Sequence, residues 1–209
     1  MQSVNGLVDF NHEAFQDTLN KYRMLEMRSS VDAIITSAAR VKDEDSDFKF
    51  DSIEAGKPRL VVVDKDASTP PNSKIFAKCG KVTLVVSKNA PQGRIDRLRD
   101  NCDIEVLRYG ELAVSLKEIM DDLGNRKVEK VLVEADGKLN TRLLNNNLVD
   151  EVYLLTLPVF LKDGHRCFYK KLKEEVRLQV DGIIQYGDQI VTHYLVRGHR
   201  HPQDKPTSL

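Results

Sequence analysis

The sequence predicts an α/β fold, with a mostly parallel central sheet flanked by helices and a C-terminal antiparallel hairpin. Two observations predict it. Short runs of β-branched residues alternate with segments in which apolar residues recur at helical spacing, a pattern typical of parallel strands joined by helices. The last two extended segments are separated by Tyr186-Gly187-Asp188, which is the turn chemistry of a hairpin. Because no shift in composition divides the 209 residues, we expect one domain over residues 1–198 and a flexible polar tail at residues 199–209.

The expected strands are short, rich in Val, Ile and Leu, and bounded by charged or turn residues. In chain order they span residues 31–37, 59–63, 81–87, 103–107 and 130–133, a strand opening at 148–151, and the hairpin strands 176–180 and 189–196.

Apolar residues at helical spacing predict helices between these strands. They are expected at residues 12–30, with Asn11 as the cap, at 74–79, around 95–99, at 114–123 and around 139–144. Gly124 is expected to end the helix at 114–123, because glycine commonly follows a helix C-terminus.

Charge and cysteine usage narrow the class of protein. Lysine and arginine number 32 and aspartate and glutamate number 32, so no overall charge attracts nucleic acid or an anionic membrane, and we expect neither as a partner. No apolar stretch is long enough to cross a bilayer, and no signal segment follows Met1. Cys79, Cys102 and Cys167 lack the spacing of a disulfide framework or a zinc site. We therefore expect a cytoplasmic protein with reduced thiols.

Candidate ligand-binding residues follow the predicted strands, because ligands of parallel sheets lie beyond the carboxyl ends of the strands. These are residues 36–40, 64–65, Ser87 and 134–138. The sequence contains no GxGxxG, GxxxxGK[ST], GxSxG or HExxH pattern, and its histidines have no spacing that specifies a metal, so no metal site is expected. The acidic run at residues 43–47 is interpreted as a solvated loop, with a cation site as the alternative.

Three of these positions allow two interpretations each. The turn Glu134-Ala135-Asp136-Gly137 puts a helix N-terminus at a strand end, where it can hold a phosphate or serve only as a connection. Lys65 can contact a nucleotide 2′-phosphate or be solvated. Arg28, at the end of a helix, can contact a ligand or interact only with the helix dipole.

Three strings carry a resemblance to a known family: RSSVDAIITSAARVKDEDSDF, KPRLVVVDKDASTPPNSKIF and VLVEADGKLNTRLLNNNLVDEVYLLTLPVFLKDG. They resemble the diaminopyrimidine ribosyl-phosphate reductase family of riboflavin biosynthesis, also known from the C-terminal domain of RibD. Members of that family have a dihydrofolate reductase-like fold. The resemblance implies a homodimeric reductase that uses NADPH to convert the ribosylamino group of a phosphorylated pyrimidine into a ribitylamino group.

The resemblance also implies roles for individual residues. Glu134 matches the catalytic, substrate-side acid, and Arg28 and Phe48 match further substrate-binding positions. The positions that match the cofactor site are Ser37, Arg40, Glu44, Lys65, Asp136, Gly137, Lys138, Leu139 and Asn140.

The sequence departs from the family pattern at several of these places. Ala135-Asp136 replaces a pair of glycines, Asp51 stands where an arginine is expected to hold the sugar phosphate, and Met1 falls where a first central strand should already have ended. A second hypothesis therefore stands beside the reductase: a catalytically silent paralogue that uses the same fold for binding or assembly.

Overall fold

The computed structural model describes residues 1–9, 11–44, 57–78, 81–169 and 171–197. Internal contacts divide the chain into two compact units. The parallel unit comprises residues 10–139, and the hairpin unit comprises residues 1–9 and 140–209. The single domain expected over residues 1–198 stays a prediction, and the expected tail at residues 199–209 lies outside the described residues.

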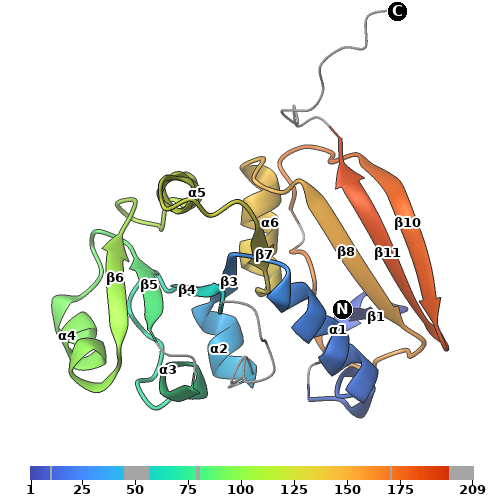
Figure 1. Cartoon of the computed structure of the whole chain (residues 1–209), viewed down its shortest axis with the longest axis horizontal. Coiled ribbons are helices and arrows are strands. Elements are labelled where there is room, and N and C mark those ends of the chain that lie inside the picture. The colour runs from blue at the N-terminus through green and yellow to red at the C-terminus, as the bar shows by residue number, and fades with distance from the viewer. Residues whose placement is uncertain (10, 45–56, 79–80, 170, 198–209) are drawn as a thin grey trace, which may run out of the picture. The chain divides into compact units, whose positions relative to one another are not determined.

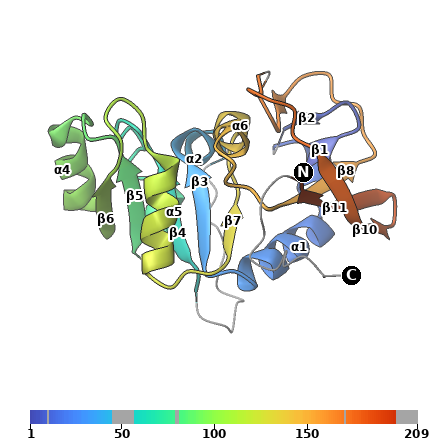
Figure 2. The same ribbon diagram turned by 90° about the horizontal axis from the view of Figure 1, so that it is seen from above.

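Five parallel strands form the sheet of the parallel unit, in the order β6-β5-β4-β3-β7 (Figure 2). They are β3 (Ala33–Ser37), β4 (Arg59–Val63), β5 (Val82–Val86), β6 (Ile104–Arg108) and β7 (Val131–Val133). All five were predicted within about two residues at each end, and the parallel central sheet is confirmed. Their continuous apolar runs reflect burial on both faces: every residue of β3 and β5 is buried.

Helices cover both faces of this sheet. Figure 1 shows α2 (Ala38–Glu44), α3 (Lys74–Lys78) and α4 (Gln92–Asn101) on its lower side and α5 (Leu116–Asn125) on its upper side. The core on the lower side consists of apolar side chains from alternate strand positions and from the three helices, among them Ile34, Leu60, Leu84, Val41, Ile75 and Ile95. Because successive side chains of a strand point to opposite faces of the sheet, alternate strand residues form the surface on which these helices pack.

Helix α1 is shorter than its periodicity predicted. It spans Thr18–Ser29, and a separate 3-10 turn, η1 (Glu13–Phe15), precedes it. The expected cap at Asn11 was wrong: the Asp17 carboxylate accepts a hydrogen bond from Leu19 N at 3.4 Å and begins the helix. An aspartate with extended backbone is a strong N-cap, which the apolar spacing alone does not reveal.

Gly124 does not end α5 as expected. It lies inside the helix, and Lys127 takes the left-handed conformation that terminates it, with φ of 65°. Val128 N donates to Leu123 O and Lys127 N donates to Gly124 O, both at 3.0 Å, which is the Schellman pattern of a helix end. The terminating position thus lies three residues beyond the glycine.

The hairpin unit contains a mixed sheet in the order β1-β8-β11-β10. Its strands are β1 (Gln2–Ser3), β8 (Glu151–Leu157), β10 (Leu178–Tyr186) and β11 (Gln189–Val196), and a separate antiparallel pair is formed by β2 (Leu7–Val8) and β9 (His165–Arg166). Helix α6 (Gly137–Asn145) contains the boundary between the two units.

The predicted C-terminal hairpin is confirmed as β10 and β11, which pair antiparallel. Its first strand begins two residues later than expected, and it continues to Tyr186 past a register shift between Val180 and Gly182. A bulge of this kind breaks the alternation on which the prediction depended. At the N-terminus a two-residue strand, β1, pairs in parallel with β8 of the same sheet.

Two further expectations concern membranes and cysteines. Among the helices of the described residues, none combines the length and apolarity that crossing a bilayer requires. Of the cysteines within the described part of the chain, Cys102 and Cys167 are both free thiols, while Cys79 lies outside it.

Candidate functional site

The strand order of the parallel unit locates a ligand site before any side chain is considered. From β3 the chain proceeds through α2 to β4, β5 and β6, and then returns to the opposite side of β3 to form β7. The connections that leave the neighbouring strands β3 and β7 therefore diverge. Such a switch point is where open parallel sheets bind ligands, at the carboxyl ends of the strands. Here it is built by residues 37–40 and 134–139.

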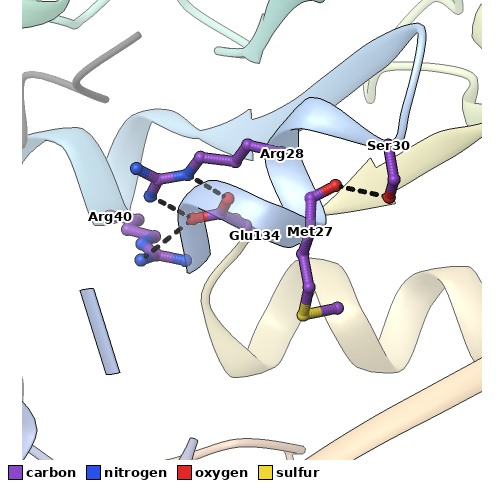
Figure 3. A network of polar contacts seen from close by, with 5 residues as sticks. All are labelled: Met27, Arg28, Ser30, Arg40 and Glu134. Carbon is purple, nitrogen blue, oxygen red and sulfur yellow. Dashed lines mark hydrogen bonds and ion pairs between the residues drawn. The ribbon is translucent and has the colours of Figure 1, made fainter. Parts of the chain in front are cut away.

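A buried ion pair occupies this switch point. Glu134 directly follows β7, and its backbone N–H donates to Ile35 O at 2.9 Å. Its carboxylate accepts hydrogen bonds from Arg28 Nε and Nη2, each at 2.7 Å. Arg40 Nη2 lies 3.5 Å from the carboxylate oxygen Oε2. Figure 3 shows the two guanidinium groups converging on the one carboxylate.

Local structure places Arg28 for this contact. Helix α1 ends at Ser29, and Ser30 donates to Met27 O through its backbone N–H at 3.3 Å and through its hydroxyl at 2.9 Å (Figure 3). Arg28 thus lies in the last helical turn, where a cation also interacts favourably with the helix dipole. Arg28 therefore has an intramolecular partner in Glu134 in addition to its interaction with the helix dipole, and a contact with a ligand stays a prediction.

Burial and neighbouring charges shift the pKa of Glu134 in opposite directions. Its side chain is 3% exposed. Burial raises the pKa of this carboxyl group, but the hydrogen bonds and charge of Arg28 and the charge of Arg40 lower it by more. The net effect is a pKa below the ordinary value. Glu134 is therefore an ionised carboxylate at neutral pH, suited to hold cations and to stabilise positive charge but not to donate a proton.

Ser37 joins the two loops of the switch point. It is buried at the end of β3, and its hydroxyl oxygen accepts from Arg40 N at 3.2 Å and from Asp136 N at 3.4 Å. The first of these contacts fixes the start of α2, which carries Arg40. The second holds the turn that follows Glu134, so Ser37 helps to set the separation of the two loops.

Asp136 caps α6. Its carboxylate oxygen Oδ1 accepts from Lys138 N at 2.7 Å and from Leu139 N at 3.3 Å. The cap stabilises the helix start, because these N–H groups have no partner within the helix. It also puts a negative charge at the group of donors that the family resemblance assigns to the cofactor pyrophosphate. A phosphate can reach these two donors only by displacing the Asp136 carboxylate.

A second polar network lies at the end of β4. The buried carboxylate of Asp64 accepts from Thr69 N at 2.7 Å, from the Thr69 hydroxyl at 2.6 Å and from the Ser68 hydroxyl at 3.0 Å. Lys65 follows it with an exposed side chain, and the Lys65 carbonyl oxygen accepts from both the backbone N–H and the hydroxyl of Ser87 at 3.0 Å. The backbone that presents Lys65 is therefore fixed on both sides.

The sequence predicted residues 64–65 as candidate positions but did not reveal the contacts of Asp64, and the role of Lys65 stays a prediction. The signal was available, because an aspartate followed within five residues by Ser68 and Thr69 is typical of a loop closed on its own carboxylate.

The remaining predicted site residues lie elsewhere. Glu44 is the last residue of α2, and Phe48 lies outside the described residues. Asn140 belongs to the hairpin unit, where its Nδ2 donates to Cys167 O at 3.0 Å. The structure thus brings together Arg28, Arg40 and Glu134, with Ser37 and the Asp136 cap beside them.

Residues 3–192 match the family model described as the RibD C-terminal domain. The chain belongs to this family. The prediction of a reductase-family member with this fold is thereby confirmed.

Relatives of this RibD C-terminal domain protein include two archaeal enzymes, each named 2,5-diamino-6-ribosylamino-4(3H)-pyrimidinone 5′-phosphate reductase. The one from Methanothermobacter thermautotrophicus is 27% identical over 187 residues, which cover 84% of this chain and 85% of the relative. The one from Archaeoglobus fulgidus is 28% identical over 145 residues, which cover 65% of each chain.

Solved structures show the same fold. A pyrimidine reductase-like protein from Corynebacterium diphtheriae matches with a TM-score of 0.75 at 18% identity, over 93% of this chain and 88% of that one. The riboflavin biosynthesis reductase Rib7 of Saccharomyces cerevisiae matches with a TM-score of 0.69 at 16% identity, over 93% and 86%. RibD from Acinetobacter baumannii matches with a TM-score of 0.71 at 19% identity, and there the chain spans 55% of the longer protein.

Proposed function

We propose that this chain is an NADPH-dependent reductase of a phosphorylated diaminopyrimidine ribosylamine, the class of compound named for its archaeal relatives. The proposed reaction converts the ribosylamino group into an open-chain ribitylamino group in riboflavin biosynthesis. Family membership over residues 3–192 supports the class of reaction. The site supports the class of ligand, because its position suits a nucleotide and its charges suit a polar substrate.

The observation that carries the proposal is the buried cluster of Arg28, Arg40 and Glu134 at the switch point. Ionised groups lose several kcal/mol of hydration when they are buried, and an apolar core at the same place would stabilise the fold at least as well. A cluster of buried ionised groups at the expected ligand site is therefore better explained by ligand binding than by stability. The cluster therefore supports a polar substrate held at the carboxyl ends of β3 and β7.

The chemistry requires orientation more than proton transfer by the protein. NADPH supplies, when bound, the hydride that reduces the sugar carbon C1′. As the C1′ carbon gains hydrogen, its bond to the ring oxygen breaks and that oxygen takes a proton from solvent. Glu134, kept ionised by Arg28, stabilises positive charge that develops at C1′. Arg28 orients the pyrimidine and its phosphate through its planar, fixed guanidinium.

The residues present fit NADPH in part. Lys65 is an exposed cation on a fixed backbone at the carboxyl edge of the sheet, which suits the additional phosphate of NADPH. Ser37, the last residue of β3, and Arg40, in the first turn of α2, lie on the same edge and suit the nicotinamide half. The N-terminus of α6 suits the pyrophosphate only if the Asp136 carboxylate moves away from Lys138 N and Leu139 N.

Calorimetric titration of the purified chain with NADPH and with NADH tests the cofactor. We expect NADPH to bind and to be the tighter of the two, and no binding at millimolar NADPH would overturn the proposal. Activity is tested by growth of a riboflavin auxotroph that lacks its own reductase. Rescue by the wild-type chain and by Glu105→Gln, but not by Glu134→Gln, is the expected result. Glu105 is a suitable control because it forms a similar pair with Arg126 away from the site.

One observation favours the second candidate function, a catalytically silent paralogue that acts in binding or assembly. The Asp136 carboxylate already occupies the donors at the start of α6. If that cap is permanent, the cofactor lacks its pyrophosphate site. Absence of NADPH binding together with absence of rescue, in a chain that is folded, supports this candidate over the reductase.

We also propose that the chain forms a homodimer, as the family resemblance implies, and that it acts in the cytoplasm, where its proposed small-molecule substrate is made.

A further inference from the structure

Arg108, the last residue of the edge strand β6, holds the segment that follows the neighbouring strand β5 (Figure 2). Its Nη1 donates to the backbone carbonyl oxygens of Ser87 at 3.4 Å, Lys88 at 2.9 Å and Ala90 at 3.4 Å. Its Nη2 donates to Gln92 Oε1 at 2.6 Å. One guanidinium group therefore contacts four residues of the same short segment.

The segment 87–92 connects β5 to α4 and contains a single turn, in which Ala90 N donates to Ser87 O at 3.1 Å. Pro91, the N-cap residue of α4, makes no side-chain hydrogen bond to the helix. The carbonyl oxygens of such a segment need donors from elsewhere. Arginine presents several N–H groups in a fixed planar fork, whereas lysine is a single-point donor. The guanidinium of Arg108 is therefore suited to set the shape of this segment.

The segment that Arg108 holds is bonded in turn to the loop that carries Lys65. Ser87 donates to Lys65 O through its backbone N–H and through its hydroxyl, each at 3.0 Å. Arg94, in the first turn of α4, donates through Nη1 to Asp66 O at 3.4 Å. Two successive carbonyl groups of the Lys65 loop are thus held, one from the end of β5 and one from the start of α4.

The backbone around Lys65 is restrained on its other side as well. Asp64 N donates to Val85 O at 2.9 Å, and the Asp64 carboxylate closes the loop by accepting from Thr69 N at 2.7 Å. Ala67 has the left-handed backbone conformation, with φ of 51°. A residue other than glycine keeps that conformation only where its surroundings hold it there. The position from which the Lys65 side chain extends therefore depends on the contacts around this loop.

From these contacts we propose that Arg108 is a positioning residue of the cofactor site. Through Ser87 and Arg94, it sets the position from which Lys65 contacts the additional phosphate of NADPH. This inference rests on the proposed function, in which Lys65 makes that contact. Arg108 itself does not touch the cofactor. A cation that is already held in place loses less conformational freedom on binding, so its contact with the phosphate contributes more affinity.

The consequence is a role for Arg108 in the choice between NADPH and NADH, because these two cofactors differ only in the phosphate that Lys65 is proposed to contact. A purely structural role would weaken both cofactors equally, or neither. A direct effect of charge would be preserved by a lysine at position 108. Loss of NADPH affinity alone, in a variant that keeps the charge, is therefore specific to positioning.

Arg108→Lys is the decisive variant, because it keeps the positive charge but cannot reach acceptors on both sides of the segment at once. We expect calorimetric titration to show NADPH binding weakened by about 3- to 10-fold and NADH binding changed by less than about twofold. Arg126→Lys is the matched control. Arg126 makes three side-chain contacts with Glu105 and Asp122 but lies away from the carboxyl edge of the sheet, so neither cofactor should be affected.

Ser87→Ala tests the connection between Arg108 and Lys65. It removes the hydroxyl bond to Lys65 O and leaves the backbone carbonyl that Arg108 contacts. NADPH binding should weaken by about two- to threefold, again without an effect on NADH. Melting temperatures of all variants show that each is folded.

Amide hydrogen exchange of the chain without cofactor tests the positioning directly. The Ser87 N–H, which donates to Lys65 O, should exchange about threefold faster or more in Arg108→Lys than in the wild type. The amides of β3 should be unchanged. Arg126→Lys should leave the exchange of Ser87 N–H at the wild-type rate.

An equal loss of affinity for NADPH and NADH in Arg108→Lys overturns the proposal, and so does an unchanged exchange rate of Ser87 N–H. Lys65→Gln in the same titrations separates this inference from the proposed function. An NADPH affinity that falls in Lys65→Gln but not in Arg108→Lys contradicts only the role of Arg108. A wild type that binds neither cofactor contradicts the reductase, while faster exchange of Ser87 N–H in Arg108→Lys would still support Arg108 as the residue that holds the Lys65 loop.

Discussion

The Arg28 guanidinium donates hydrogen bonds from Nε and Nη2 to the two carboxylate oxygens of Glu134, although the two residues are 106 positions apart in the chain. The pair is planar and bidentate, so it fixes the orientation of both groups as well as their distance. It also joins the last turn of α1 to the residue after β7. The stability of the parallel unit and the geometry of the candidate site therefore depend on the same contact.

Glu134→Gln should destabilise the chain by about 3–5 kcal/mol, because it leaves Arg28 and Arg40 buried without the charge that they face. Glutamine has nearly the shape of glutamate, so little packing changes. Denaturant unfolding at neutral pH measures the loss. The control is Glu105→Gln, which removes an equally two-pronged pair with Arg126 whose side chains are 29% and 27% exposed. There the loss should stay below about 1 kcal/mol. Equal losses of unfolding free energy in the two variants would show that burial does not increase the contribution of the Glu134 pair to stability.

Lowering the pH should remove the contribution that the ionised Glu134 side chain makes to the stability of the fold. Its pKa is lowered in the folded chain, so its stabilisation is present above the ordinary value of 4.5 and is lost as the pH falls toward the folded value. The difference in unfolding free energy between the wild type and Glu134→Gln should therefore shrink below pH 4.5, by at most about 1.4 kcal/mol per pH unit for one proton. Unfolding of both proteins from pH 7 to pH 3 tests this. A constant difference would mean that Glu134 keeps its ordinary pKa.

The sheet of the parallel unit could be predicted because its strands carry the signal in themselves. The segments AIITS and VTLVV are mostly apolar and β-branched, which is typical of strands buried on both faces. The carboxyl ends of such strands are candidate sites on topology alone, and this reasoning predicts Glu134, Ser37 and Lys65 as site residues. The signals behind these predictions all lie within single short segments of the sequence.

The remaining features depend on contacts that no local pattern contains. Arg28 and Glu134 were each identified, but nothing in either segment shows that one binds the other. The bulge at Asp181 was missed because it breaks the alternation by which strands are recognised. Asp136 is a different case. An aspartate directly before Gly137 and a helical segment is an ordinary N-cap, but the helix start was interpreted as a phosphate site or as a simple connection, and the cap was not predicted.

Asp136→Ala should tighten NADPH binding by about 3- to 10-fold if the start of α6 holds the pyrophosphate, because it removes a negative charge and frees Lys138 N and Leu139 N. The same change should cost about 1 kcal/mol of stability through loss of the cap. Asp136→Asn keeps a capping oxygen without the charge and should tighten binding with little loss of stability. Calorimetric titration and thermal unfolding measure the two effects. Unchanged affinity in both variants would place the pyrophosphate elsewhere.

Lys65→Gln should weaken NADPH binding by about tenfold and leave NADH binding nearly unchanged, since a single cation beside the additional phosphate contributes on the order of 1 kcal/mol. Stability should not change, because the side chain is exposed. Lys88→Gln is the matched control: Lys88 lies just after the next strand, β5, and pairs with Glu111 at 3.0 Å. Its loss should affect neither cofactor. An equal loss for NADPH and NADH in Lys65→Gln would move the contact to a phosphate that both cofactors share. An equal loss of NADPH affinity in both lysine variants would instead indicate that binding depends on the overall positive charge of this region. The position of Lys65 after β4 would then have no special role.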